Sequence, residues 1–207
     1  MNGEQILKIL AEYNEKIFPL QYVAYILGFL VLVLACRKST LSSRIISAIF
    51  AMLWLWVAAV FALPYAIDGM TNAIITAVFF FIQGGFFLHQ ILRPKLHFGT
   101  YSKTFTIVGI LFVLGAMVGY LIIGQIMGHT YPGYFPFGLA PCPLTVFTLG
   151  IYMFTSKKIP KHLLILPFLF SLTGILPVTL GLYEDIIFLL SGLICAPMLY
   201  FRDRRLE

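Results

Sequence analysis

Three side chains that could bind a soft metal lie within sixteen residues of one another: Met127, His129 and Cys142. A thioether, an imidazole and a thiolate together suit an ion such as Cu(I). Their spacing matches no standard ligand motif, and nothing in the sequence fixes a ligand geometry. Packing of Cys142 as a small buried hydrophobe, with His129 at the membrane interface, is therefore favoured. A thiol- or metal-dependent membrane protein using Cys142 and His129 remains the alternative.

A second set of polar residues could bind a small organic solute. Gln83 is near the centre of one apolar segment, and Thr173 is midway along another, between Pro167 and Pro177. Transporters place binding sites where Gly or Pro interrupts a helix near the midplane of the bilayer. Hydrogen bonds between helices are the ordinary alternative for each such residue. The predicted ligand-binding set is Gln83, Gly138, Cys142, Thr145 and Thr173.

The composition is that of an integral membrane protein. Of 207 residues, 60% are hydrophobic and only 11% are charged, whereas a soluble domain averages about 25% charged residues. The net charge of +6 is explained by basic residues that set topology, so no nucleic-acid partner is predicted. The expected partner is the lipid bilayer.

Seven apolar segments indicate an all-α, polytopic membrane helix bundle. Most of them approach the roughly 20 residues that a helix needs to cross the hydrocarbon layer. The seven segments are Pro19–Cys36, Arg44–Ala66, Asn72–Leu92, Phe105–Met127, Pro141–Thr155, His162–Leu182 and Asp185–Phe201.

The connecting loops predict the orientation. Twelve of the fourteen Lys and Arg residues fall on one side of the predicted bundle, and six of the eight acids fall on the other. Because basic loops stay in the cytoplasm, we expect the amino terminus outside and the carboxyl terminus inside a bacterial plasma membrane.

The first eighteen residues predict an amphipathic helix on the outer surface. Apolar residues such as Ile6, Leu10 and Ile17 share one helical face, Glu and Lys share the other, and Asn2 suits the cap position. The predicted organisation is residues 1–18 as this outer helix and residues 19–207 as the seven-helix transmembrane domain.

The fifth apolar segment is too short to cross a bilayer. Residues 144–155 give twelve helical positions, or about 18 Å against about 30 Å of hydrocarbon. The preceding stretch, FPFGLAPCP, contains prolines that oppose a regular helix. We therefore expect a re-entrant or broken segment at about 129–143, lining an outward-open cavity and covered by protein. A locally thin bilayer or tilted neighbouring helices is the alternative.

Ionisable residues are scarce inside the predicted spans. Apart from His89, no ionisable residue lies far from the end of a span. We therefore expect no Asp or Glu within the spans that could orient His129. Proton relays and charge-coupled carriers require such groups. The sequence therefore favours a protein that is not an enzyme, and it identifies no cofactor.

The start MNGEQ…LAEYNEKIFPLQ and the block GHTYPGYFPFGLAPCPLTVFTLG resemble a bacterial family of integral membrane proteins of unknown function. The resemblance extends over the whole chain and implies the same seven-span layout. It implies no activity and no site residues.

The leading functional hypothesis is the binding or permeation of a small uncharged or apolar solute through an outward-facing pocket. The second is a non-enzymatic accessory subunit of a membrane complex. In the second case the Gly115–Gly119 pair in the fourth segment would provide a helix contact, within the bundle or in a homo-oligomer.

Overall fold

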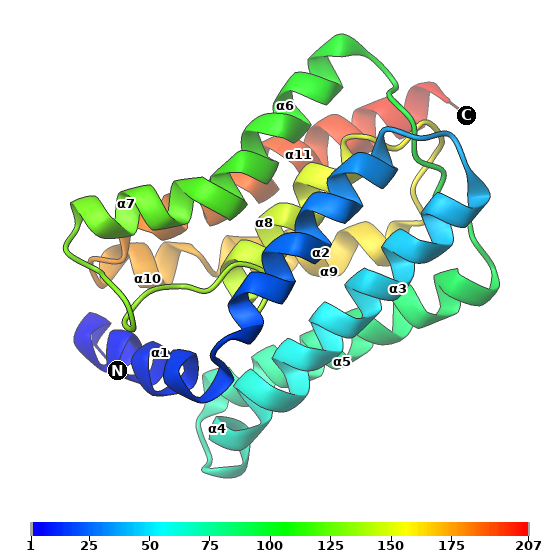
Figure 1. Cartoon of the computed structure of the whole chain (residues 1–207). Coiled ribbons are helices and arrows are strands. Elements are labelled where there is room, and N and C mark those ends of the chain that lie inside the picture. Colours follow the sequence, from blue (N-terminus) through cyan, green and yellow to red (C-terminus); the bar gives the residue numbers. More distant parts are fainter. Residues whose placement is uncertain (1, 207) are drawn as a thin grey trace.

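The computed structural model describes residues 2–206, and every regular element in that range is helical (Figure 1). The predicted all-α membrane bundle is confirmed. Five continuous helical stretches are long and apolar enough to cross a bilayer. They are Thr40–Ile67, Thr71–Leu92, Lys103–Ile126, Lys161–Thr179 and Tyr183–Arg205.

Each of the seven predicted segments corresponds to a helix or a chain of helices. The first is α2 (Leu20–Ala35), and the second is α3 (Thr40–Trp56), which continues through a π-helical turn into α4 (Leu63–Ile67). The others are α5 (Thr71–Leu92), α6 (Lys103–Leu114) with α7 (Tyr120–Ile126), α8 (Pro141–Tyr152), α9 (Lys161–Leu172) with α10 (Ile175–Thr179), and α11 (Ile186–Arg205). The count of seven is approximate, because α2 and α8 are shorter than the five long stretches.

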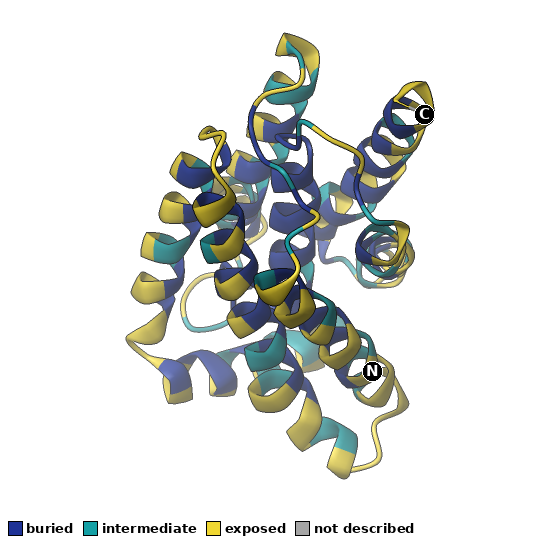
Figure 2. Ribbon diagram, turned by 90° about the vertical axis from the view of Figure 1, so that its right-hand side faces the viewer, coloured by how far each residue is buried: buried dark blue, intermediate teal, exposed yellow. Residues whose placement is uncertain are grey.

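The short helix α8 lies at the centre of the bundle. Eleven of its twelve residues are buried, and α2, α3, α6, α9 and α11 all contact it. In Figure 2 the dark-blue, buried stretches of ribbon lie toward the middle of the bundle, and the yellow, exposed stretches lie on its outside. A largely uncharged, apolar sequence such as PCPLTVFTLGIY, whose two threonines bond within the helix, gives a helix with no face suited to water. Pro141 and Pro143 fall in its first turn, where a missing N–H costs no helical hydrogen bond.

The segment that precedes α8 is irregular and covered by protein. No regular helix forms between Ile126 and Pro141, and residues 135–140 are all buried. An irregular segment at 127–140 therefore precedes α8, which begins at Pro141 rather than at the predicted Leu144. That this segment lies within the bilayer stays a prediction; its burial is what such a position requires.

The amino-terminal helix α1 (Gly3–Ile17) supports this irregular segment. Asn2 caps it with a reciprocal capping box, and the chain then bends by 88° into α2. The Nδ2 of Asn14 donates to the carbonyls of Pro132 and Tyr134, both at 2.7 Å, and the Tyr13 hydroxyl donates to Leu139 O at 2.9 Å. Each contact supplies a partner for a backbone carbonyl that no helix pairs.

The basic loops meet at the opposite end of the bundle, near the carboxyl terminus in Figure 1. A side chain at Gly99 would touch Lys38, Ser156 N donates to His97 O, and Arg202 donates to Lys157 O. These contacts join three loops that are far apart in the sequence, and the end of α11, into one polar end. The Gly115–Gly119 pair contacts Ile187 of α11, so it packs within the chain.

Candidate functional site

Two adjacent carboxyl groups are buried at the end of the bundle that carries α1. Glu184 and Asp185 end a single 3-10 turn, Tyr183–Asp185, directly before α11. The turn packs against α7, α10 and α11. Glu184 is 1% exposed and Asp185 is not exposed at all, although acidic residues are almost never fully buried unless they are paired.

Asp185 lies among neutral donors. The Tyr120 hydroxyl, from α7, donates to Asp185 Oδ1 at 2.8 Å. Cys142, in the first turn of α8, lies near the same carboxyl. Tyr120 is 3% exposed, and Cys142 belongs to the buried helix α8, so both residues lie in the interior of the bundle.

Glu184 is paired with His129. The distance from His129 Nδ1 to Glu184 Oε1 is 2.9 Å, and the histidine side chain is 13% exposed. The chain turns back after α7 at Gly128, which has a φ of +85°, and His129 N then donates to Gly124 O at 2.7 Å. A glycine adopts this left-handed backbone without steric cost, so Gly128 allows the turn that brings His129 to the carboxyl pair.

One oxygen of each carboxyl lacks a hydrogen-bond partner. Glu184 Oε2 and Asp185 Oδ2 are both inaccessible, and neither has a partner among the described residues. Buried polar atoms are normally satisfied, because an unpaired one costs free energy. Two such atoms on neighbouring residues make this turn the candidate site for a proton, an ion or a polar ligand. We call the five residues Tyr120, His129, Cys142, Glu184 and Asp185 the carboxyl cluster.

A surface hollow of about 400 Å³ adjoins the carboxyl cluster. Of the cluster's residues, only His129 lines it. The other lining residues come from the start of α1 and from the turn after α10: Asn2, Gly3, Glu4, Leu7, Leu180, Gly181 and Leu182. His129 therefore joins an open hollow to a buried acidic pair.

The residues predicted to bind a solute come from several different elements and have separate partners. Thr145 donates to Pro141 O and Thr173 to Phe170 O, each within its own helix region. Gln83 Nε2 donates to Leu163 O at 3.1 Å, and its Oε1 is unpaired. Gly138 faces Ala24 and Leu53. Of the predicted set, only Cys142 belongs to the carboxyl cluster.

The residues predicted to bind a soft metal are also engaged separately. His129 pairs with Glu184, Cys142 faces Asp185, and Met127 is 40% exposed. Across residues 2–206, no group of three or more His, Cys, Asp or Glu side chains has an arrangement suited to a metal ion.

The expectation that no carboxylate could orient His129 was wrong. The sequence places Glu184 and Asp185 on the outer side, at the start of the seventh apolar segment, and gives no sign that they are buried. The structure buries them, because α7, α10 and the start of α11 pack around the turn. The sequence analysis did not identify Tyr120. The one local signal for this region is the acidic pair itself, which directly precedes an apolar run and has no Lys or Arg nearby in the sequence.

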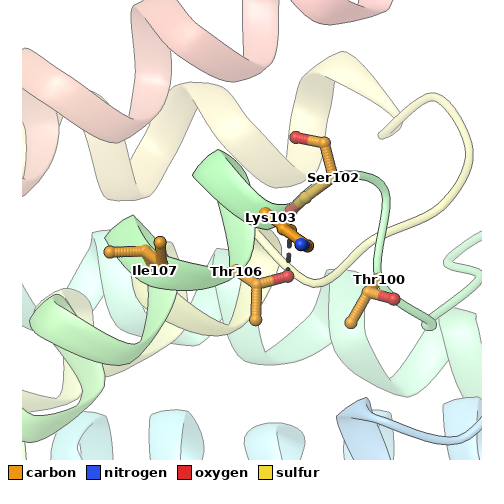
Figure 3. A pocket seen from close by; sticks show the side chains of 5 residues that line it. All are labelled: Thr100, Ser102, Lys103, Thr106 and Ile107. Carbon is orange, nitrogen blue, oxygen red and sulfur yellow. Dashed lines mark hydrogen bonds between the residues drawn. The ribbon is translucent and has the colours of Figure 1, made fainter.

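A second hollow, of about 470 Å³, lies at the basic end. Figure 3 shows its lining around the start of α6: Thr100, Ser102, Lys103, Thr106 and Ile107. The Thr106 hydroxyl donates to Ser102 O, as the dashed line shows. Neither unpaired carboxyl oxygen adjoins this hollow, so the carboxyl cluster is the stronger candidate site.

The fold and this cluster together define an all-helical membrane protein with a buried acidic pair at one end. The chain belongs to the family of unknown function DUF6064, whose model matches residues 3–207. Searches of curated proteins and of solved structures found no match.

Proposed function

We propose that this protein binds, and carries across the membrane, a small polar solute that enters through the hollow beside His129. The site faces outward, with the amino terminus outside a bacterial plasma membrane. The supporting observation is the pair of unpartnered oxygens, Glu184 Oε2 and Asp185 Oδ2, in side chains that are at most 1% exposed.

This proposal changes the expected ligand from an apolar solute to one with hydrogen-bond donors. The apolar expectation rested on a lack of buried charge, and a buried carboxyl pair removes that reason. Carboxyl oxygens accept hydrogen bonds, so a ligand with N–H or O–H groups can satisfy both unpaired atoms. Most solute-binding sites combine an apolar lining with a few such polar groups.

The test is a thermal-shift screen of the purified full-length protein with small amines, amides, polyols and apolar solutes. A ligand that prefers the folded state raises the unfolding temperature with its concentration. We expect a hit among the donor-bearing solutes, loss of its shift in Asp185→Asn, and an unchanged shift in Ser47→Ala. Ser47 is a suitable control because its hydroxyl only bonds within α3, to Ser43 O.

Two results would count against this function. One is a screen in which no donor-bearing solute stabilises the wild-type protein. The other is a shift that survives in Asp185→Asn but disappears in Gln83→Met, which would move the site to the deeper position predicted from the sequence.

A further inference from the structure

The carboxyl cluster has fewer positive partners than negative groups. His129 is its only basic side chain, and it pairs with Glu184. Tyr120 and Cys142, which face Asp185, are neutral donors. A protonated His129 can therefore neutralise one buried carboxylate but not both.

The elements packed around the acidic turn supply no further cation. α7 contributes Tyr120, α8 contributes Cys142, and the segment between them contributes His129. α10 has the sequence ILPVT and carries no ionisable side chain. On α11 the first ionisable residue after the turn is Cys195, which is more than two helical turns away. Glu4 of α1, at the hollow, adds another acid.

A second uncompensated carboxylate in this place would be costly. Moving a charge from water into a protein interior costs several kcal/mol even after relaxation, unless it is paired. A group in that situation usually takes up a proton instead.

We infer that the Glu184–Asp185 pair is a proton-binding site that holds one exchangeable proton, and that His129 passes this proton to and from the hollow. The chemistry is acid–base only: an O–H bond forms on the carboxyl pair as an N–H bond of the imidazolium breaks. The imidazole suits this role because it can accept a proton on one ring nitrogen while it donates from the other. It is also the cluster's only side chain that borders the hollow.

This inference concerns the same cluster as the proposed function but requires no solute. Proton binding is measured on the protein alone, so it can fail while solute binding holds, and the reverse. If both hold, solute binding depends on pH.

Infrared spectroscopy of the full-length protein in lipid nanodiscs tests the proton site. We expect the carbonyl stretch of a protonated carboxylic acid at neutral pH in the wild type and its loss in Asp185→Asn with Glu184→Gln. The matched control is Asp68→Asn, because Asp68 is an exposed acid elsewhere, and it should leave the band unchanged. A wild-type spectrum without the band, or a band that survives the double substitution, would overturn the inference.

A milder substitution tests the same proton site with less risk that the protein misfolds. Tyr120→Phe keeps the ring and removes one hydroxyl that donates to Asp185 Oδ1. A hydrogen bond to a carboxylate favours its ionised form, so in this variant the band should persist to a more alkaline pH than in the wild type. An unshifted titration in a folded Tyr120→Phe protein would show that the band does not come from Asp185.

The role of His129 is tested by the rate of exchange into heavy water. We expect His129→Gln to keep the acid band but to slow its isotope shift about tenfold or more, because a positioned acid–base group typically speeds proton transfer by at least that factor. An exchange rate equal to that of the wild type would remove His129 from the path and leave only the proton-binding site.

Discussion

Among individual residues, Arg202 shows how a charge that looks topological can be structural. The sequence places it with the other basic residues after the last span. In the structure it is buried: Nε and Nη2 donate to Asp203 Oδ1, Nη1 donates to Thr155 O and Oγ1, and Nη2 donates to Lys157 O. Its guanidinium also lies 5.6 Å from the ring centres of Tyr101 and Phe105. One side chain of α11 thus contacts the loop before α6, the start of α6 and the loop after α8.

We predict that Arg202→Lys destabilises the protein by about 2–3 kcal/mol, although it keeps the charge. A lysine lacks the planar fork that serves several acceptors at once, and each lost hydrogen bond to a charged group is worth about 1.5–3 kcal/mol, part of which the ammonium recovers. Chemical unfolding in detergent measures the difference. Arg205→Lys, at an exposed position, is the control and should change stability by less than about 0.5 kcal/mol. Equal effects of the two substitutions would show that the buried fork is not needed.

At the scale of elements, the position of α8 depends on close backbone approach to α6. An added Cβ at Gly109 of α6 would lie 2.9 Å from Gly150 O, and one at Gly150 of α8 would lie 3.1 Å from Val113 N. Membrane helices approach this closely only where small residues face each other. This close crossing with α6 fixes the position of α8 in the bundle. Because Cys142 belongs to α8, the crossing also fixes the position of Cys142 near Asp185.

We predict that Gly109→Ala separates α6 from α8 and lowers stability by about 1–3 kcal/mol, the usual range for overpacking a well-packed core. Gly85→Ala in α5 is the matched control, because nothing lies within 4 Å of its added Cβ. Alanine favours a helix by up to about 1 kcal/mol over glycine, so this control should be neutral or stabilising. Thermal unfolding of both variants in the same detergent measures the change in stability. An unchanged stability of Gly109→Ala would argue against a tight crossing of α6 and α8.

Sequence reasoning found the elements more readily than the contacts between them. Long apolar runs bounded by basic loops mark spans such as Thr71–Leu92 whatever their neighbours are, because length and hydropathy are local properties. The His129–Glu184 pair joins residues 55 positions apart, and no local pattern predicts it. The same holds for Tyr120 and Asp185, so the cluster could be recognised only from the packing of α7, α8 and the turn before α11.

For the whole molecule, the two ends differ in chemistry. The end with α1 carries the buried carboxyl cluster and the hollow beside His129, while the other end joins the basic loops (Figure 1). The positive-inside rule would place the basic end in the cytoplasm, and the carboxyl cluster would then open to the outside. Cys36 and Asp68, which flank the continuous helix Thr40–Ile67 of 28 residues, lie at opposite ends.

We predict that a membrane-impermeant maleimide fails to label Cys36 in intact cells and labels it once the membrane is opened. Cys36 is a suitable reporter because it is the exposed cysteine, while Cys195 is buried and Cys142 is partly buried. The reciprocal reporter is Asp68→Cys in a Cys36→Ser background, which should react in intact cells because Asp68 is exposed at the other end. A helix of this length spans about 42 Å at 1.5 Å per residue, enough to keep the two positions in different compartments.

Labelling of Cys36 but not of the Asp68→Cys variant in sealed cells would reverse the orientation and turn the carboxyl cluster toward the cytoplasm. Labelling of both would contradict a membrane-spanning helix between them.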